Sequence, residues 1–372
     1  MSKVAPPAAV GDRLADVDTP ALLIDLDAFE ANLVAVHRYV ADRGGRVRSH
    51  GKAHKCSAIG LRQIAAGAVG LCCQKVGEAE VFVDAGIRDV LVSNVVVGAS
   101  KARRLARLAG RARVGACVDG VLQIEQLAAA AREEGTTIEL LIEVDVGAGR
   151  CGVSGADEAL ALAGLIDAHR PFLTLRGIQA YHGPAQHMRS VTERAVAIGQ
   201  AAARASRIAT ALRAAGHPVQ EICGAGTGTY AYELGSEVYT ELQPGSYVLM
   251  DADYGANQTD PDLPRLSQAL GVWCTVITSR PGHAVLDGGL KTFAVDSGPP
   301  TVLEPGWKTR GLSDEHTVIV PQGDARPLAV GEKLRLVPGH CDPTVNLHDW
   351  LVAHRGDRVE EVWAIDARGA LF

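Results

Sequence analysis

The sequence predicts an α/β protein with a (β/α)8 barrel followed by a small antiparallel β domain. From about residue 20 to residue 251, short apolar runs rich in Val, Ile and Leu alternate with amphipathic runs of helical spacing. Strands separated by helical patterns of roughly 10–15 residues form parallel sheets, and seven or eight such units fit a closed barrel better than an open sheet. After residue 268 the apolar runs follow one another without helical patterns between them, which indicates an antiparallel domain.

The predicted elements follow in chain order. Barrel strands are expected at 21–27, 46–52, 69–76, 89–97, 113–120, 138–147, 174–183, 219–228 and within 236–251. Helices are expected at 28–44, 57–68, 77–87, 101–110, 121–135, 156–169 and 190–215. Strands of the second domain are expected at 271–280, 283–289, 317–323, 333–339 and 359–369. We therefore divide the chain into a barrel, residues 20–258, and a β domain formed by residues 1–19 and 268–372.

The composition excludes several classes of partner. The 372 residues carry a net charge of −6, which gives no electrostatic footprint for nucleic acid or an anionic membrane. No apolar stretch is long enough to span a bilayer, and the first twenty residues lack the apolar core of a secretory signal. The eight cysteines form no C-x-x-C pair and are expected to be small buried hydrophobes in a reducing compartment. We therefore expect a cytoplasmic protein that acts on a small molecule.

The candidate reactive residues follow the predicted barrel strands, because the active groups of such barrels lie at the C-terminal strand ends. Lys52 stands in R-S-H-G-K-A-H-K-C, beside Arg48, His50, His54 and Lys55. Neighbouring cations disfavour the ammonium form, so we expect the pKa of Lys52 to be lowered and its amine to be nucleophilic. A solvated basic loop is the alternative for this segment taken alone. The other residues at strand ends are Gln74, Arg150, Tyr181 and His182.

Two glycine-containing loops follow the last two predicted strands. They read G-A-G-T-G-T over 224–229 and Q-P-G-S-Y over 243–247. Backbone N–H groups of such loops can hold a phosphate, and barrels commonly bind phosphate after their last strands. The first loop is neither a Walker A loop, since no G-K-[ST] follows, nor a dinucleotide fingerprint, since it comes late in the barrel. Tight turns remain the alternative.

A candidate metal site lies in V-P-G-H-C-D-P-T, over 337–344. His340 and Asp342 are two residues apart, so on an extended strand they would face the same way and could hold one divalent ion. Cys341 would then point away. His348 and Asp349 are further candidates, and a polar turn is the alternative.

Taken together, these motifs resemble those of fold-type III pyridoxal-phosphate enzymes, which have an alanine racemase-like barrel. The resemblance covers roughly residues 19–370 and is strongest to the D-threonine aldolase and D-serine dehydratase group. Within that group it is strongest to 3-hydroxy-D-aspartate aldolases and D-threo-3-hydroxyaspartate dehydratases. The motifs that carry it are T-P-A-L-L-I-D-L-D, R-S-H-G-K-A-H-K, E-V-D-V-G-A-G-R-C-G-V, Q-A-Y-H-G, G-A-G-T-G-T, E-L-Q-P-G-S-Y and P-G-H-C-D-P-T.

The resemblance implies a role for each candidate residue. Lys52 would carry pyridoxal 5'-phosphate as a Schiff base, and Arg150 would face the pyridine nitrogen and keep it unprotonated, which weakens the ring as an electron sink. The phosphate would be held by Gly226, Thr227, Gly245, Ser246 and Tyr247, and the ring would be lined by Gln74 and Tyr181. His340 and Asp342 would hold a divalent metal. Because aspartate is a hard ligand, we expect Mn²⁺ or Mg²⁺ before Zn²⁺ or Co²⁺. Where relatives have R-P-H before the lysine, this chain has Arg48-Ser49-His50.

The resemblance also implies a lyase that acts as a homodimer. The leading hypothesis is retro-aldol cleavage of a D-3-hydroxy amino acid, with 3-hydroxy-D-aspartate giving glycine and glyoxylate, and with D-threonine-type substrates as well. His50, His182 or a metal-bound water would take the hydroxyl proton, and Arg48, His50 and His54 would suit a second substrate carboxylate. If Lys52 instead removes the Cα proton, the same site would act as a dehydratase and release a 2-oxo acid and ammonia.

Two further alternatives share the fold type. A racemase would need no metal, and the H-x-D motif at 340–342 argues against it. Barrel-only pyridoxal-phosphate proteins of cofactor homeostasis lack a C-terminal β domain, which this sequence has after residue 268.

Overall fold

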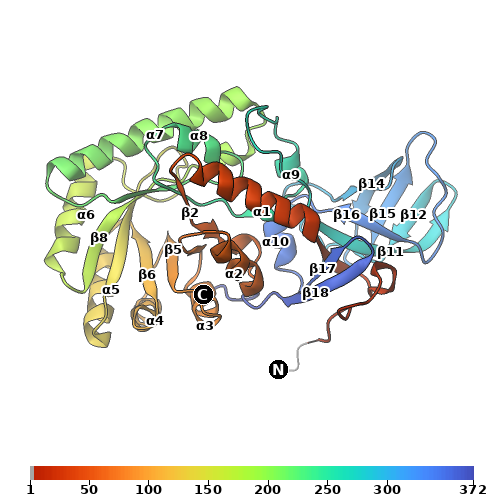
Figure 1. Cartoon of the computed structure of the whole chain (residues 1–372), viewed down its shortest axis with the longest axis horizontal. Coiled ribbons are helices and arrows are strands. Elements are labelled where there is room, and N and C mark those ends of the chain that lie inside the picture. Colours follow the sequence, from red (N-terminus) through yellow and green to blue (C-terminus); the bar gives the residue numbers. More distant parts are fainter. Residues whose placement is uncertain (1–3) are drawn as a thin grey trace.

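The computed structural model describes residues 4–372, which form two lobes (Figure 1). The larger lobe is a ring of strands surrounded by helices, and the smaller lobe, mainly blue in Figure 1, is built of strands. In the described residues, no helix is long and apolar enough to cross a membrane.

The larger lobe is a closed barrel of parallel strands. Its strands are hydrogen-bonded in the order β2-β10-β9-β8-β7-β6-β5-β4-β3, and β2 and β3 are two halves of one segment interrupted at Arg48. Because β2 pairs with β10 and β3 pairs with β4, this segment closes the cylinder. The strands are β2 (Arg46–Val47), β3 (Ser49–His50), β4 (Leu71–Cys73), β5 (Asp89–Val95), β6 (Arg113–Val118), β7 (Ile138–Glu143), β8 (Leu173–Gln179), β9 (Glu221–Gly224) and β10 (Glu241–Leu242).

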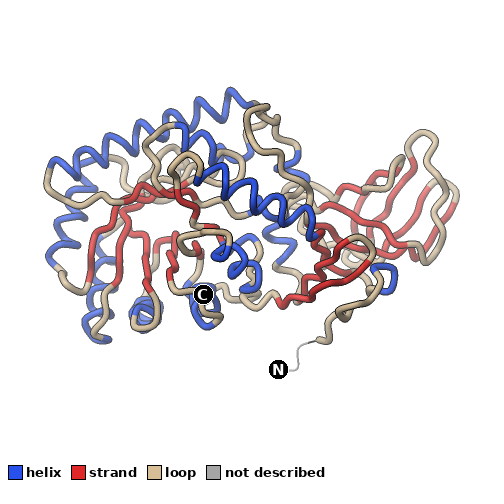
Figure 2. The backbone as a smooth tube through the Cα atoms, viewed as in Figure 1, coloured by secondary structure: helices blue, strands red, loops and turns tan. Residues whose placement is uncertain are grey.

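Helices cover the outside of this ring (Figure 2). Their buried faces carry apolar side chains at helical spacing, as α1 does with Phe29, Leu33, Val36 and Val40. The helices are α1 (Leu26–Ala41), α2 (Ser57–Ala65), α3 (Val76–Asp84), α4 (Ala99–Ala109), α5 (Val121–Glu134), α6 (Ala156–Ala168), α7 (Val191–Ala214), α8 (Tyr230–Gly235) and α9 (Ala252–Gly255). The predicted succession of strands and helices is therefore confirmed from residue 46 onward.

The first predicted strand belongs to the other lobe. β1 (Ala21–Asp25) pairs antiparallel with β11 and parallel with β17, so the expectation that it opens the barrel is wrong. A short apolar run fits either sheet, and the barrel is already closed by residues 46–50. The predicted division at residue 20 thus leaves a strand of the β sheet on the barrel side, and the domain boundaries remain a prediction.

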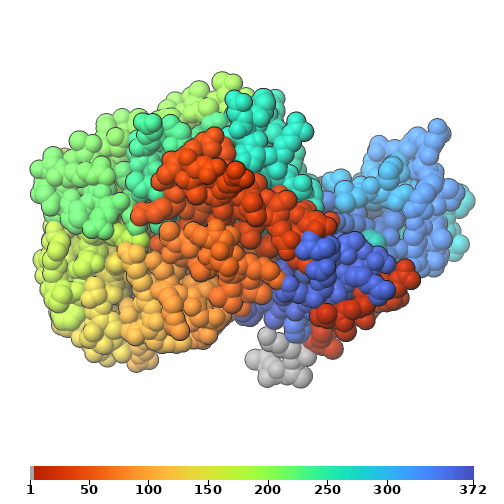
Figure 3. Space-filling view, viewed as in Figure 1, coloured from red at the N-terminus to blue at the C-terminus, as the bar shows by residue number. Residues whose placement is uncertain are grey.

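The smaller lobe is a mainly antiparallel sheet, in which only β1 and β17 pair in parallel among the described strands. Its strand order is β14-β15-β12-β11-β1-β17-β18, and β16 pairs with both β13 and β11. The N-terminal segment, red in Figure 3, lies along this lobe and packs Ala8 and Val17 against Val352 and Val359. The sequence did not predict β13, β14 or β17. The elements are β11 (Leu270–Arg280), β12 (His283–Leu286), β13 (Thr301–Val302), β14 (Trp307–Leu312), β15 (Thr317–Pro321), β16 (Lys333–Val337), α10 (Cys341–Val345), β17 (Trp350–Arg355) and β18 (Arg358–Ala364).

The barrel interior is filled in layers. A small apolar cluster occupies its middle and consists of Cys72, Leu91, Cys117, Leu141 and Cys223. Below it, towards the N-terminal strand ends, the fully buried Arg48 donates to Glu241 (2.7 Å) and to Asp89 (2.6 Å). Gly70 is required here, since a Cβ at that position would lie 2.2 Å from the Arg48 guanidinium. Above the apolar layer, at the C-terminal strand ends, the barrel opens into a cavity.

Candidate active site

The cavity at the C-terminal strand ends has a volume of about 370 Å³. It brings together most of the site residues that the sequence predicted, and it draws them from both lobes. Those that line it are His50, Lys52, Gln74, Arg150, Tyr181, Gly226, Thr227, Gly245, Ser246, His340 and Asp342.

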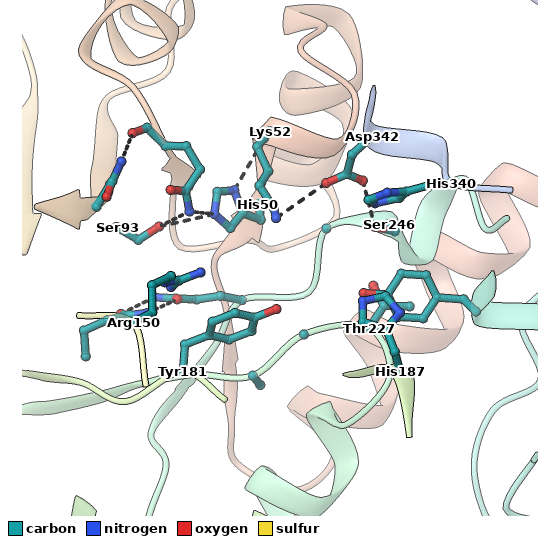
Figure 4. Close-up of a pocket in the computed structure, with 18 of the residues that line it drawn as sticks. His50, Lys52, Ser93, Arg150, Tyr181, His187, Thr227, Ser246, His340 and Asp342 are labelled. Carbon is teal, nitrogen blue, oxygen red and sulfur yellow. Dashed lines mark hydrogen bonds and ion pairs between the residues drawn. The ribbon is translucent and has the colours of Figure 1, made fainter. Parts of the chain in front are cut away.

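Lys52 lies where β3 ends and a short 3-10 helix, Gly51–Ala53, begins. Its Nζ is 3.5 Å from Oδ2 of Asp342, and its side chain is 40% exposed to the cavity (Figure 4). Burial alone would lower the pKa of Lys52, but the nearby carboxylate of Asp342 and the Tyr181 hydroxyl raise it above its ordinary value. The expected lowering is therefore wrong, because an acid from the second lobe faces the amine.

The neighbouring basic residues, which supported the expectation of a lowered Lys52 pKa, have partners of their own away from the Lys52 amine. Arg48 lies at the bottom of the barrel with Glu241, and Lys55 pairs with Glu78 at 2.5 Å. His54 is buried and shares a hydrogen bond of 3.2 Å with Gln63. Since neither Arg48 nor His54 lines the cavity, the expectation that they bind a second substrate carboxylate is wrong.

His50 is the histidine that faces the amine. Its Nδ1 accepts from the backbone N–H of Lys52 (3.4 Å), and its Nε2 is 3.2 Å from Oγ of Ser93 and 3.0 Å from the side-chain amide of Gln74 (Figure 4). Burial, together with the charge of Lys52, holds the pKa of His50 well below its ordinary value. A neutral imidazole at this position can accept a proton inside the cavity.

The first glycine loop follows β9 and has the form of an anion cradle. In the described residues, the backbone N–H groups of Gly226 and Thr227 donate no hydrogen bond, and the buried Thr227 hydroxyl has no partner. The loop is fixed from behind by Gln186, whose Oε1 accepts from the N–H of Gly228 (3.0 Å) and whose Nε2 donates to Thr229 (2.7 Å). A Cβ on Gly226 would lie 2.5 Å from Gln186. These unpaired donors fit the phosphate of the cofactor that the resemblance implies.

His340 and Asp342 come from the second lobe, but not from a strand. His340 caps the short helix α10 and Asp342 lies in its first turn, so the extended geometry expected for the pair is wrong, although both side chains reach the cavity. Nδ1 of His340 is 2.6 Å from Asp296, which leaves Nε2 free, and Ser246 donates to Asp342 at 3.0 Å. A histidine oriented by a carboxylate beside a hydrogen-bonded aspartate is a donor set that fits a divalent metal. His348 and Asp349 do not line the cavity.

Two predicted residues do not reach the cavity with their side chains. The Tyr247 side chain is fully buried behind it, where its hydroxyl contacts His37 (2.7 Å) and Ser49 (3.0 Å). His182 faces the loop at Gly147 and accepts from the N–H of Ala185 through Nδ1. Both residues follow strand ends, but the local backbone turns their side chains away. Only the backbone of Tyr247 therefore remains as a candidate phosphate contact.

Sequence reasoning missed several cavity residues. His187 pairs with Asp253 at 2.6 Å, and the amides of Gln179 and Gln243 bond to each other on the cavity floor at 2.7 Å. Alternation along the strands gives a signal for Gln179 and Ser93, since each lies two residues beyond an inward-facing position of the strand. No such signal exists for His187, which ends a short 3-10 helix, Pro184–His187, after β8. The other missed residues that line the cavity are Lys75, Asn94, Ala225 and Tyr254.

The fold and the cavity define a class of protein. Residues 24–253 match the family model of the alanine racemase N-terminal domain, and residues 269–354 match that of a putative serine dehydratase domain. The chain therefore belongs to the alanine racemase-like barrel family, whose members use pyridoxal phosphate, and its second lobe matches the model of a putative serine dehydratase domain.

Within this class the relatives are lyases that act on D-hydroxy amino acids. The chain is 47% identical to D-threonine aldolase of Arthrobacter sp, with 98% of this chain and 96% of the relative covered. It is 44% identical to 3-hydroxy-D-aspartate aldolase of Paracoccus denitrificans, with 98% and 95% covered. The crystal structure of D-threonine aldolase from Filomicrobium marinum matches with a TM-score of 0.96 at 45% identity, over 98% of this chain and all of that one. D-threo-3-hydroxyaspartate dehydratase of Delftia sp. is more distant, at 28% identity over 90% of this chain. The chain is an enzyme of this family.

Proposed function

We propose that this protein is a pyridoxal-phosphate and divalent-metal-dependent aldolase that cleaves D-3-hydroxy amino acids. The observation that carries the proposal is the distance of 3.5 Å between Nζ of Lys52 and Asp342. It brings the amine that would join the cofactor next to the ligands that would hold a metal, and the aldolase relatives support the same reaction.

The cofactor, when bound, supplies an aldehyde for an amine to join and an aromatic ring that spreads the electron pair left when the Cα–Cβ bond breaks. The divalent metal supplies a Lewis acid for the hydroxyl of the substrate. His340 and Asp342 would hold the metal, and we propose Mn²⁺ or Mg²⁺ because of the hard carboxylate ligand.

The residues of the chain bind and orient these groups. Gly226, Thr227 and Gly245 present backbone N–H groups, and Ser246 lies beside them, so this edge of the cavity would hold the phosphate. Tyr181 and Gln74 line the sides on which a flat ring would rest. The phosphate contacts and the amine of Lys52 would together hold the cofactor in this cavity.

His50 is the proposed base for the substrate hydroxyl. Of the two histidines expected for this role, only His50 lines the cavity, and its imidazole is neutral because burial lowers its pKa. It would accept the hydroxyl proton as the Cα–Cβ bond breaks, and it would later return a proton to the glycine product. The dehydratase reaction would instead need Lys52 to remove the Cα proton. A homodimer remains a prediction from the resemblance.

A product assay tests the proposal. The protein, loaded with pyridoxal phosphate and Mn²⁺, would be incubated with 3-hydroxy-D-aspartate and with D-threonine. We expect glycine with glyoxylate from the first substrate and glycine with acetaldehyde from the second, and we expect EDTA to abolish both activities and added Mn²⁺ to restore them. Release of oxaloacetate and ammonia would contradict the aldolase and support the dehydratase. Full activity after chelation would contradict the metal site.

A further inference from the structure

Glu143 is a buried acid directly beneath the cavity that the proposed reaction does not use. It is the last residue of β7, and its register partner on β8 is Gln179, which lines the cavity floor. Because partners in register on parallel strands point to the same face of a sheet, Glu143 also points into the barrel. Glu143 is only 6% exposed to solvent.

The carboxyl of Glu143 lacks a full set of partners. The Cys117 thiol bonds to it, but its Oε2 has no hydrogen-bond partner in the described part of the chain. The pKa of Glu143 is raised to about 8, mainly by burial and also by the nearby Asp119 and Asp145, while the charge of Arg150 is the strongest influence that lowers it. A buried carboxyl with an unmatched oxygen requires an explanation, because such groups are costly to bury.

Arg150 is the complementary unmatched group. Within the described residues it has no carboxylate within 4.0 Å, and its guanidinium lies over the Tyr181 ring, 5.8 Å from its centre. Arg150 lines the cavity and stands only seven residues after Glu143. The cavity thus holds an unpaired cation near an acid that is missing a partner.

The loop between these two residues is rigid. Val153 donates to the carbonyl of Glu143 (2.9 Å), and Asp145 donates through its N–H to the carbonyl of Val153 (3.1 Å). The carboxylate of Asp145 accepts from the N–H groups of Gly147 and Gly149, at 2.9 and 3.1 Å. The backbone on either side of Arg150 is therefore fixed, and the guanidinium is the part that can move relative to Glu143.

We propose that Glu143 is the positioning residue for Arg150, drawing the guanidinium over the cavity floor and holding it against the cofactor ring. The inference rests on the proposed function, since it needs a cofactor in this cavity. Arg150 would contact the cofactor, whereas Glu143 would act only through Arg150. The amides of Gln179 and Gln243 bond to each other, and neither satisfies the free oxygen of Glu143 in the described residues.

The test compares Glu143→Gln, which keeps the shape and removes the ionisable carboxyl, with Glu143→Asp, which keeps an ionisable carboxyl. Both are made also in an Arg150→Ala background. Glu139→Gln is the matched control, because Glu139 lies on the same strand but pairs with Arg176 and Arg113 at the opposite end of the barrel. The readouts on the loaded proteins are the visible absorption band of the bound cofactor from pH 6 to pH 9.5, the cofactor dissociation constant, and kcat and KM.

We expect Glu143→Gln to shift the pH midpoint of the cofactor band and to lower kcat by about tenfold or more, the usual size of effects from residues that orient a ligand-contacting group. Glu143→Asp should recover part of the loss, and Glu139→Gln should leave the band unchanged. In the Arg150→Ala background, Glu143→Gln should add almost nothing, because residues that act as a unit are not additive. If Glu143→Gln does not fold, Glu143→Asp and its double variant carry the same comparison.

An unchanged band and kcat in Glu143→Gln, or a full additional loss in the Arg150→Ala background, would overturn the inference. A wild-type protein that forms no coloured complex with pyridoxal phosphate would overturn the proposed function instead. The wild-type spectrum therefore distinguishes the two failures.

Discussion

The two ends of the barrel use charge in opposite ways. At the N-terminal strand ends, Arg48 binds Glu241 and Asp89, and Arg176 binds Glu221 and Glu139, so each buried cation has acids around it. At the C-terminal ends, Arg150 has no acid within 4.0 Å and the Thr227 hydroxyl has no partner in the described residues. Buried charges that are paired satisfy one another within the fold, whereas unpaired polar groups in a cavity are available to bind a ligand.

The same contrast separates the proposed metal site from a second cluster of possible metal ligands. Glu221, Cys223 and Glu241 place their ligand atoms within 4.8 Å of one another, as metal ligands would. Their carboxylates, however, already bind Arg176 and Arg48. At the mouth, His340 and Asp342 have only two ligand side chains, but they face open space beside Lys52. The proposed metal site is therefore the one at the mouth, and the paired cluster has a structural role.

Removing the buried cation at the N-terminal end of the barrel should have the largest effect on stability. Arg48→Met leaves Glu241 and Asp89 buried without their cation, and removing one partner of a buried ion pair costs about 3–5 kcal/mol of unfolding free energy. The same substitution at the mouth, Arg150→Met, removes no ion pair and should change stability by less than about 1 kcal/mol. Urea unfolding of both variants checks this. Equal losses would mean that the two ends do not differ.

Removing the proposed metal ligand Asp342 should affect activity rather than stability. Asp342→Asn should lower kcat by about a hundredfold or more, because a bound metal contributes several kcal/mol to the transition state. Addition of Mn²⁺ should not restore the variant at concentrations that saturate the wild type. Cysteine-to-alanine exchange at Cys341, which lies between the two ligands but is buried, is the control and should keep the same requirement for Mn²⁺. An active Asp342→Asn protein would contradict the assignment.

The unpaired hydroxyl in the glycine loop allows a smaller test. Thr227→Val removes one hydrogen bond to the expected phosphate, and bonds to charged groups are worth about 1.5–3 kcal/mol. Cofactor affinity should fall by about tenfold or more, and Thr227→Ser should stay near the wild-type value. Absorbance titration with pyridoxal phosphate measures both. Equal affinity of the Val variant and the wild type would show that the loop does not hold the phosphate.

The smallest expected effect is a change in how stability depends on pH, caused by a buried acid near the cavity. Glu233 is buried behind the glycine loop, where it accepts from Thr229 at 2.8 Å, and burial raises its pKa to about 8. The folded state therefore binds a proton that the unfolded state releases near pH 4.5, so stability contributed by this proton is lost as pH rises towards 8. Glu233→Gln should lose less stability than the wild type between pH 5 and pH 8.5. Thermal unfolding checks this, with the exposed Glu237→Gln as a control that should follow the wild type.

The barrel could be predicted from the sequence, because the spacing of apolar residues and the length of each run distinguish its strands from its helices. From residue 46 onward, each apolar run of strand length is followed by a helical pattern, and the observed elements agree with the predicted order. The run at 21–25 could not be assigned to a sheet, because its pairing with Leu270–Trp273 depends on residues almost 250 positions away. The short strand β13 pairs only two residues and leaves little pattern to detect.

The sequence predicted which residues lie near the site, but not which way their side chains point. Lys52 and Arg150 follow strand ends and reach the cavity, whereas Tyr247 turns behind it towards His37. The raised pKa of Lys52 was also beyond local reasoning, because its cause, Asp342, lies 290 positions later in the other lobe. Local sequence shows which cations are adjacent along the chain, but only the fold shows which acids neutralise them.

The central claim is that the amine of Lys52 is the point of cofactor attachment, and reduction of the loaded protein tests it most directly. Borohydride treatment after addition of pyridoxal phosphate fixes the pyridoxyl group on the lysine that holds it, and peptide mapping by mass spectrometry locates that lysine. We expect a single label on Lys52 that is absent from Lys52→Ala. A label on Lys75, the other lysine that lines the cavity, or no stoichiometric label at all, would contradict the account.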